Sequence, residues 1–322
     1  MKRKPKFEIR YPKSKTRGAA IMLALWALFL LAAMVISWAL DIDARFSLSA
    51  NANRRLEAVA MACSGAEVAM NPSIKPGSPN LRRQISDRRS YEARLTGEDG
   101  RLNINTLITL AAANNVSGCG QDVKLDVLCR YLTNRGIELN DLSVMIDSLL
   151  DWVAPGGGLH RLNAPPESEN YHPSHTLFAR LDELKKVKGW EEFTSNPGWD
   201  KDFTLNSSGS IDVTWASRDV LLALPGMSEN AVDHFLELRR GPDGIDGTED
   251  DMQRDSEHVR AALNLTPTSP QWQVLITGIP PLITFQSRFY RIVSIGKSGN
   301  AQRTVQLVFQ RGTTAISVWR EY

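Results

Sequence analysis

The hydrophobic pattern of the chain begins with a long uncharged segment. Ala19 to Leu40 spans 22 residues without a charge, and as a helix it would extend about 33 Å, enough to cross the apolar core of a bilayer. Residues 1–18 hold eight Lys or Arg and one acid, and Asp41 and Asp43 follow the segment. Because basic residues favour the cytoplasmic side, we expect a single-pass inner-membrane anchor with a cytoplasmic N-terminus and a periplasmic bulk.

The apolar pattern continues at helical spacing after the membrane segment. No proline interrupts residues 19–70, and Asn71-Pro72 then ends the pattern. One helix over 19–70 is therefore predicted, buried in lipid first and amphipathic second. Its expected apolar face comprises Leu56, Val59, Ala60, Cys63, Ala66 and Met70.

After residue 70, the spacing of apolar residues changes twice, from a strand pattern to a helical pattern and back to a strand pattern. Residues 71–90 contain three prolines and a glycine and predict a loop. A hairpin is expected from Tyr91–Leu95 and Arg101–Ile104, joined by a turn at Gly97–Gly100. Residues 106–265 predict mainly helix. Strands are expected at Phe289–Ile295, Thr304–Phe309 and Ile316–Trp319, with Val305, Leu307 and Phe309 on one face.

This order predicts an α+β fold in which a small antiparallel sheet is interrupted by a large all-α insertion. The expected parts are a basic leader (1–18), a spine helix (19–70), a first part of the α+β domain (71–105), an inserted helical domain (106–270) and a C-terminal sheet (271–322).

Composition narrows the function classes. The chain has 322 residues, 42% of them apolar, and a net charge of +2, which suits a packed core and gives no general case for a nucleic-acid partner. Cys119 and Cys129 lie ten residues apart. They can pair in an oxidising compartment or remain buried thiols together with Cys63, and the sequence leaves this open.

The junction before the apolar segment has three interpretations. A cleaved secretory signal has a shorter apolar core than this one, whereas a plain anchor fits the length. The third is a pilin-type signal, because Lys15-Thr16-Arg17-Gly18 abuts the apolar segment directly. This arrangement resembles the substrates of prepilin peptidase and implies cleavage between Gly18 and Ala19, followed by N-methylation.

Further segments appear in a recognisable order along the chain. The chain resembles the K-type minor pseudopilins of type II secretion systems, which have a pilin spine, a small sheet and a helical insertion with helix-hairpin-helix-like units. The segments that carry the resemblance are Gly100–Thr106, Ile146–Trp152, Leu181–Leu184 with Val187–Gly189, and Ile211–Ala216 with Val220–Met227.

The resemblance implies a non-enzymatic assembly subunit. Such a protein joins I-type and J-type minor pseudopilins at the tip of a periplasmic pseudopilus and helps to secrete folded proteins. Two departures stand out. Residues 153–158 lack the acids usual after the Asp-Trp pair, and Asp212 and Trp215 replace the usual Asn and Thr.

Position in the fibre depends on one missing carboxylate. Pilin-like subunits usually carry Glu at the fifth mature position, where it pairs with the amine of the subunit above. Counting from Ala19, this position is Leu23. A subunit with nothing above it does not need the carboxylate, which is costly in lipid, so we expect a tip subunit. The alternative is an ordinary membrane helix outside any fibre.

One loop carries candidate metal chemistry. Its acids are Asp243, Asp246, Glu249, Asp250 and Asp251, interspersed with three glycines. Ca²⁺ takes six to eight oxygens on a flexible loop, so this loop predicts a calcium site, although it does not follow the EF-hand pattern and a solvated acidic loop is equally compatible. His172 and His175 lie three residues apart, but no third ligand for a metal such as zinc lies near them in the sequence.

Two other function classes remain as alternatives. The hairpin at Leu224–Met227 is of a kind that presents backbone N–H groups to phosphates and fits a membrane-anchored DNA-uptake protein. However, Glu229, Asp233 and Glu237 would repel a phosphate backbone. An anchored periplasmic hydrolase is the enzyme alternative, and no catalytic motif in the sequence supports it.

Overall fold

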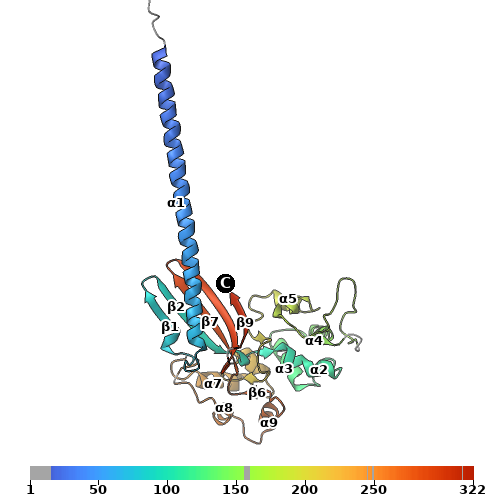
Figure 1. Cartoon of the computed structure of the whole chain (residues 1–322). Coiled ribbons are helices and arrows are strands. Elements are labelled where there is room, and N and C mark those ends of the chain that lie inside the picture. The colour runs from blue at the N-terminus through green and yellow to red at the C-terminus, as the bar shows by residue number, and fades with distance from the viewer. Residues whose placement is uncertain (1–15, 156–159, 245, 249, 314) are drawn as a thin grey trace, which may run out of the picture. The chain divides into compact units, whose positions relative to one another are not determined.

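The computed structural model describes residues 16–155, 160–244, 246–248, 250–313 and 315–322 (Figure 1). Lys15 and Glu249, which belong to the predicted leader junction and the predicted calcium loop, lie outside these residues. The chain divides into two compact units between Leu56 and Glu57, and we describe each by itself.

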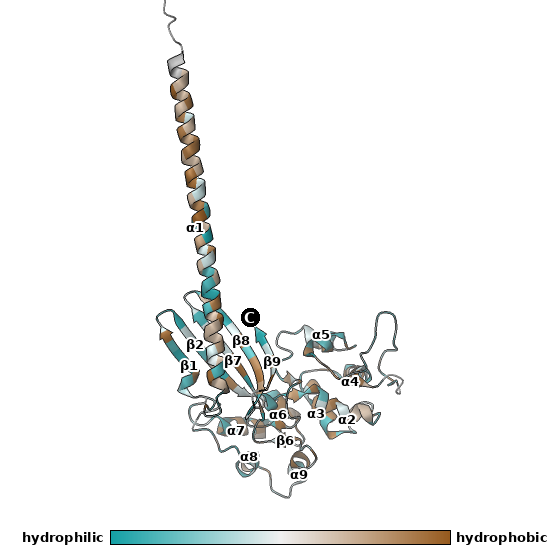
Figure 2. Ribbon diagram, viewed as in Figure 1, coloured by the Kyte–Doolittle hydropathy of each residue, from teal (hydrophilic) through white to brown (hydrophobic). Residues whose placement is uncertain are grey.

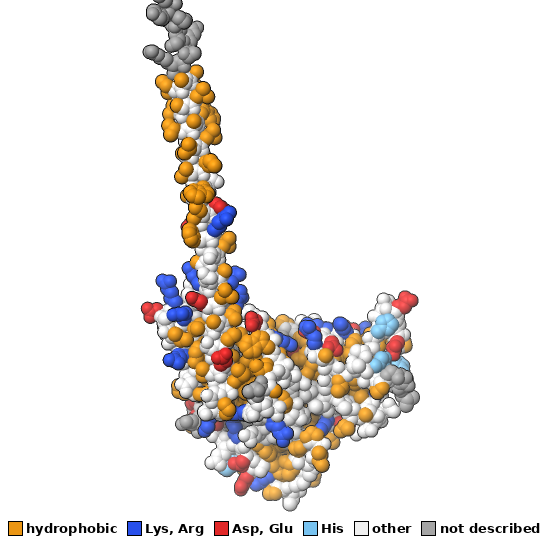
Figure 3. Space-filling view, in the orientation of Figure 1, with side chains coloured by type: hydrophobic (Ala, Val, Ile, Leu, Met, Phe, Trp, Pro, Cys, Tyr) orange, Lys and Arg blue, Asp and Glu red, His pale blue; other side chains and the backbone are white. Residues whose placement is uncertain are grey.

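The first unit is the N-terminal part of a single helix, α1 (Thr16–Met70), which confirms the predicted spine. Its apolar side chains are exposed: Trp26 and Trp38, for example, are 63% and 68% accessible. Figures 2 and 3 show the hydrophobic character of this segment on the visible face. Among the described residues, one helix is long and apolar enough to cross a membrane, and it is this one.

The second unit contains an antiparallel sheet. Within the described residues it has five strands in the order β1-β2-β7-β8-β9, so β2 joins the N-terminal strand pair to a strand that follows much later in the chain. Their bounds are β1 (Arg82–Ser86), β2 (Arg89–Gly97), β7 (Phe289–Ser298), β8 (Ala301–Gln310) and β9 (Ile316–Glu321). The three predicted C-terminal strands are therefore confirmed, as is the shared buried face of Val305, Leu307 and Phe309.

The predicted N-terminal hairpin was wrong in its pairing. Residues 71–90 are not all loop, because they contain η1 (Pro79–Leu81) and β1, and β1 is the hairpin partner of β2. Gly97–Gly100 does not turn back on β2. It leads through η2 (Glu98–Gly100) into β3 (Leu102–Asn103), which pairs in parallel with β4 (Phe203–Thr204). Local turn residues suggested a hairpin, whereas long-range pairing decided the partner.

The C-terminal part of α1 packs on the sheet through small residues, and the predicted apolar face was partly wrong. Leu56 and Ala60 are exposed, whereas Ala58, Ala62, Ala66 and Ala69 are buried. The reason is close approach. A Cβ at Gly296 on β7 would overlap the backbone of Ala58 and Ala62, so only small side chains fit between helix and strand.

The helical block lies between β3 and β7 and has its own hydrophobic core (Figure 1). A short parallel pair, β5 (Ile211–Asp212) with β6 (Ile283–Thr284), links its second half to the segment entering β7. Its helices are α2 (Ile104–Ala113), α3 (Val123–Asn134), α4 (Leu139–Val153), α5 (Glu191–Ser195), α6 (Arg218–Ala223), α7 (Glu229–Arg239), α8 (Ser256–Ala262) and α9 (Pro270–Ile276), with η3 at Leu181–Lys186.

The predicted boundary between the inserted helical domain and the C-terminal sheet, at residue 270, falls at the start of α9. Trp272 and Leu275 of this helix belong to the core of the helical block, as does Leu282 beyond it. Residues 270–283 therefore pack with the block rather than with the sheet.

Two local features explain how the block is built. Asn103 caps α2 by accepting a hydrogen bond from the Thr106 amide at 3.3 Å, as an N-cap side chain does. Asn105 binds the backbone of Phe178 in both directions, at 2.9 and 3.0 Å. Cys119 and Cys129 are joined by a disulfide, which settles the question that the sequence left open.

Candidate functional site

The junction between the sheet and the helical block is held by two buried acids of η2. Glu98 is fully buried and accepts hydrogen bonds from Arg291 at 2.6 and 2.7 Å, from Arg101 at 2.8 Å and from the Thr204 hydroxyl at 2.6 Å. A carboxylate with two guanidinium partners and a hydroxyl is well compensated for its burial. This cluster ties η2, β4 and β7 together.

Asp99 makes the second tie. It is fully buried and accepts from the backbone N–H groups of Ser208 at 2.6 Å, Arg288 at 2.5 Å and Phe289 at 3.1 Å. The same carboxylate thus fixes the chain where it leaves the sheet and where it returns to it. The sequence did not predict this role for either acid, because both lie in the predicted turn at Gly97–Gly100 and nothing local distinguishes them from turn residues.

Asp212, one of the two departures from the family pattern, is also buried. Its oxygens accept from Thr214 Oγ1 at 2.7 Å, from the Thr214 amide at 2.9 Å and from Ser287 Oγ at 2.6 Å. Burial raises the pKa of Asp212 above its usual range, against the opposing effect of these hydrogen bonds.

The acidic loop after α7 is tied down by arginines. Asp246 pairs with Arg239, whose Nε lies 2.9 Å from Oδ1, and the largely buried Arg239 also donates to the carbonyls of Val213 and Ala216 at 3.1 and 2.7 Å. Asp251 pairs with Arg254 at 2.8 Å. The carboxylate of Asp250 accepts from Thr248 Oγ1 at 2.7 Å and from the amide of Asp243 at 3.0 Å.

The acidic loop is the predicted calcium site. In the part of the chain that the structure describes, no three His, Cys, Asp or Glu side chains gather as metal ligands. Two of the four described acids of the loop, Asp246 and Asp251, bind arginines. Calcium binding stays a prediction. Either Asp246 and Asp251 would have to release their arginines to bind the ion, or the ion would have to be bound by Asp243, Glu249 and Asp250 alone.

The two hairpin turns are occupied by the protein itself. The amide of Gly189 donates to Glu191 Oε2 at 2.7 Å, so a carboxylate of the chain takes the place that a phosphate would need. At the second hairpin, a Cβ at Gly226 would lie 3.0 Å or less from the side chain of Gln271 on α9. Arg218 nearby pairs with Asp233 at 2.6 Å. In the part of the chain that the structure describes, the Gly189 amide and the Arg218 guanidinium are thus used for contacts within the protein.

The Asp-Trp segment of α4 has a structural role. Asp151 accepts from Arg161 Nη1 at 2.8 Å and lies 2.8 Å from His160 Nδ1. Asp147 accepts from Ser117, Gly118 and Asn163. These contacts fasten the segments at 117–118 and 160–163 to α4.

His172 and His175, the two neighbouring histidines considered as metal ligands, have different surroundings. His175 Nδ1 lies 2.7 Å from the Ala154 carbonyl and its Nε2 lies 3.1 Å from Glu167. His172 is exposed. The pair is therefore not brought together as metal ligands.

The residue after the predicted cleavage site, Ala19, and the residue at the fifth mature position, Leu23, both lie on α1. Ala19 and Leu23 are within the helix and exposed, Leu23 at 71%. The helix begins at Thr16, so the Gly18–Ala19 bond lies in its first turn.

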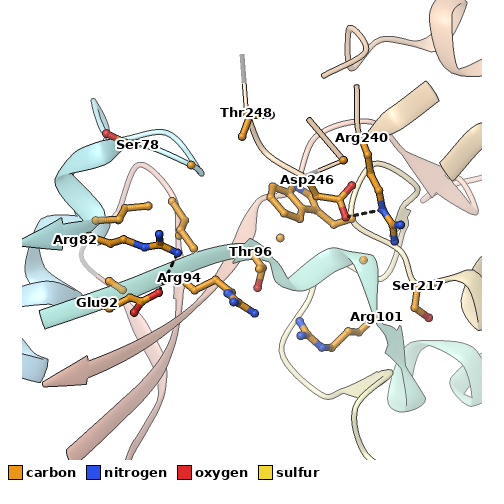
Figure 4. Close-up of a pocket in the computed structure, with 18 of the residues that line it drawn as sticks. Ser78, Arg82, Glu92, Arg94, Thr96, Arg101, Ser217, Arg240, Asp246 and Thr248 are labelled. Atoms are coloured by element: carbon orange, nitrogen blue, oxygen red, sulfur yellow. Dashed lines mark ion pairs between the residues drawn. The ribbon is translucent and has the colours of Figure 1, made fainter. Parts of the chain in front are cut away.

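A cleft of about 670 Å³ lies in the second unit, between β2 and the loop after α7 (Figure 4). Two ion pairs flank it: Arg82 with Glu92 at 3.0 Å, and Arg240 with Asp246 at 3.7 Å. Arg94 and Arg101 lie between these pairs in Figure 4. Trp215, the second departure from the family pattern, also lines the cleft.

Comparison with known proteins gives a likeness of fold. No family model and no curated protein sequence matches the chain. A solved structure does: a chain of the GspK–GspI–GspJ complex from the type 2 secretion system of enterotoxigenic Escherichia coli, at 10% identity and a TM-score of 0.58, covering 85% of this chain and 99% of that one. The chain therefore has a mixed α+β, pilin-like fold that matches the K-type pseudopilin resemblance of its sequence segments.

Proposed function

We propose that this chain is a minor pseudopilin of a type II secretion system. The observation that carries the proposal is the combination of one continuous helix, apolar over residues 19–40, with a sheet interrupted by a helical block. The likeness to a chain of the GspK–GspI–GspJ complex over 85% of the sequence supports it. In this assignment the helix anchors the subunit in the inner membrane, with residues 1–18 cytoplasmic and the second unit periplasmic.

The finer proposal is a place at the tip of the pseudopilus. Leu23 cannot neutralise the N-terminal amine of a subunit above it, whereas the amine of Ala19, once residues 1–18 are removed, can attract a carboxylate from a subunit below. The helical block from α2 to α9 would crowd a tightly stacked shaft, and it fits more easily at an end. I-type and J-type minor pseudopilins are the proposed partners, and prepilin peptidase is the proposed processing enzyme.

Two measurements test this function. The full chain, extracted in mild detergent after crosslinking in cells, should retain other pilin-like proteins that mass spectrometry identifies. Immunogold labelling of overproduced pseudopili should mark one end of the fibre. Label along the shaft would refute the tip position, and a chain that retains no pilin-like protein would favour a plain membrane anchor.

A further inference from the structure

Half of strand β2 has a sheet partner on one side only. β1 pairs with β2 as far as Arg82 opposite Glu92, whereas β2 continues to Gly97 and pairs with β7 throughout. Before Arg82 the chain forms η1, so no strand continues alongside Ala93–Gly97. An antiparallel strand directs alternate N–H and C=O groups to each edge. Within the described residues, no backbone hydrogen bond from outside the sheet reaches this segment.

The cleft follows this open edge. Ala93–Gly97 line it, with Pro79, Leu81 and Arg82 on the β1 side. Trp215 stands at the other end, where it packs so closely on Gly97 and Gly100 that a Cβ at either glycine would overlap it. The open edge is about 17 Å long at 3.3 Å per residue, and the cavity volume of about 670 Å³ is within the range of ligand-binding sites. An extended segment of about five residues matches this length.

The charge of the cleft is unbalanced at its centre. Arg94 is exposed and has no hydrogen bond or ion pair to any described residue. It alternates with Ala93 and Leu95, which face the α1 side, so its side chain lies on the opposite face of the sheet. On either side of Arg94, the charges are paired: Arg82 with Glu92, and Arg240 with Asp246. The guanidinium of Arg94 therefore lies beside open backbone groups with no carboxylate of the described residues bound to it, and a guanidinium binds a carboxylate strongly.

We propose that the cleft binds an extended acidic segment of a partner protein, which adds as a strand to the open edge of β2 at Ala93–Gly97 and places an Asp or Glu on Arg94. Main-chain hydrogen bonds supply affinity in such strand addition, and side-chain contacts supply specificity. The cleft runs along the edge of the sheet, and Arg94 in its lining lies on the face opposite α1. The proposal is independent of the assignment to secretion.

A binding measurement on the full chain in detergent micelles tests the proposal. The probe is a blocked, fluorescent six-residue peptide in which glutamate alternates with valine. Replacing its glutamates by glutamine should weaken binding about tenfold, because the charge-assisted hydrogen bond to Arg94 becomes a weaker neutral one. N-methylation of alternate peptide bonds, which keeps the charge and removes the donors, should weaken binding by at least a similar factor.

Variants of the protein locate the site. Arg94→Ala should weaken binding of the peptide about tenfold. Arg83→Ala is the matched control, because Arg83 is an exposed arginine on β1 opposite Tyr91, on the α1 side of the sheet, and it should leave binding unchanged. Hydrogen exchange should show new protection, when the peptide is present, of those amides of 93–97 that point to the open edge.

Several results would overturn the proposal. Equal binding of the glutamate and glutamine peptides would show that the site does not recognise a carboxylate. Equal binding of the N-methylated and unmethylated peptides would show that the peptide does not add as a strand. Competition by inorganic phosphate as strong as by the peptide would indicate a simple anion site, and tighter binding of duplex DNA would indicate a different class of ligand. Unchanged affinity of Arg94→Ala would place the peptide elsewhere.

Discussion

The backbone of α1 at Ala62 passes directly over Gly296 of β7, so closely that a Cβ on Gly296 would overlap the amide nitrogen of Ala62. This contact sets the distance between the spine helix and the sheet within the second unit. It also explains why the buried positions of the helix there are alanines and a glycine, rather than the larger apolar residues of its sequence.

The first prediction follows from this contact. Gly296→Val should destabilise the second unit by about 2 kcal/mol, as overpacking of a dense core does, because the helix backbone cannot withdraw without losing the burial of Ala58 and Ala66. Thermal melts of the full chain in detergent, followed by tryptophan fluorescence, measure it. Lys297→Ala is the control, since Lys297 is the exposed next residue on the same strand. Equal melting temperatures of the two variants would contradict the close packing.

The second prediction concerns the buried acid of η2. Glu98→Ala should cost about 3 kcal/mol, because it leaves the half-buried Arg291 and Arg101 without the carboxylate that both of them bind. The matched control is Glu92→Ala, which removes an exposed ion pair with Arg82 and should cost about 0.5 kcal/mol. Chemical denaturation compares the two, and similar costs would show that the junction does not depend on Glu98.

The third prediction uses the raised pKa of Asp212. A folded-state pKa above the unfolded value of 3.8 means that the folded state binds the proton more tightly. The protonated form therefore favours folding below pH 3.8, and this contribution is lost as pH rises through the folded-state pKa. Asp212→Asn removes the buried charge. Its Oδ1 can still accept from Thr214, while its Nδ2 can donate to Ser287 Oγ, which reverses the direction of that bond.

The variant should accordingly melt at a higher temperature than the wild type at pH 7, and the difference should shrink as pH approaches 3.8. Melts of both proteins across that range provide the measurement. A variant that is less stable than the wild type at pH 7 would mean that the carboxylate gains more from its hydrogen bonds than it loses by burial.

The fourth prediction concerns calcium. A ligand that binds the native state raises its stability by mass action, so melts in Ca²⁺ and in chelator should differ if the loop binds the ion. Asp246→Ala should shrink the difference, but it also strips Arg239 of its partner. Asp250→Asn is the cleaner variant, since Asp250 pairs with no arginine among the described residues. Identical melts with and without Ca²⁺ would refute calcium binding.

The fifth prediction is proteolytic processing. If prepilin peptidase cleaves the chain, N-terminal sequencing of membrane-extracted protein should begin at Ala19, with a methylated amine detected by mass spectrometry. An intact Met1, or a start beyond Leu40, would exclude a pilin-type signal.

The sequence by itself determined the elements that depend on local pattern. The apolar segment at 19–40 and the uninterrupted period beyond it predicted α1 to its last residue, because hydrophobic length and the absence of proline act locally. The alternation around Val305 and Leu307 predicted β8 for the same reason. The order of helix, helical block and sheet, together with family-like segments such as Gly100–Thr106, predicted a split α+β fold.

Tertiary structure decided what depends on partners far away in the chain. Glu98 and Asp99 look like turn acids, and only the return of the chain at Arg288–Arg291 makes them the buried centre of the junction. β1 could not be predicted from a polar segment whose stability comes from pairing with β2. Arg94 is an ordinary polar position in an alternating strand. It comes to line a cleft without a charged partner among the described residues because β1 begins only at Arg82 and the helical block lies beside β2. Neither feature can be read from the residues next to Arg94.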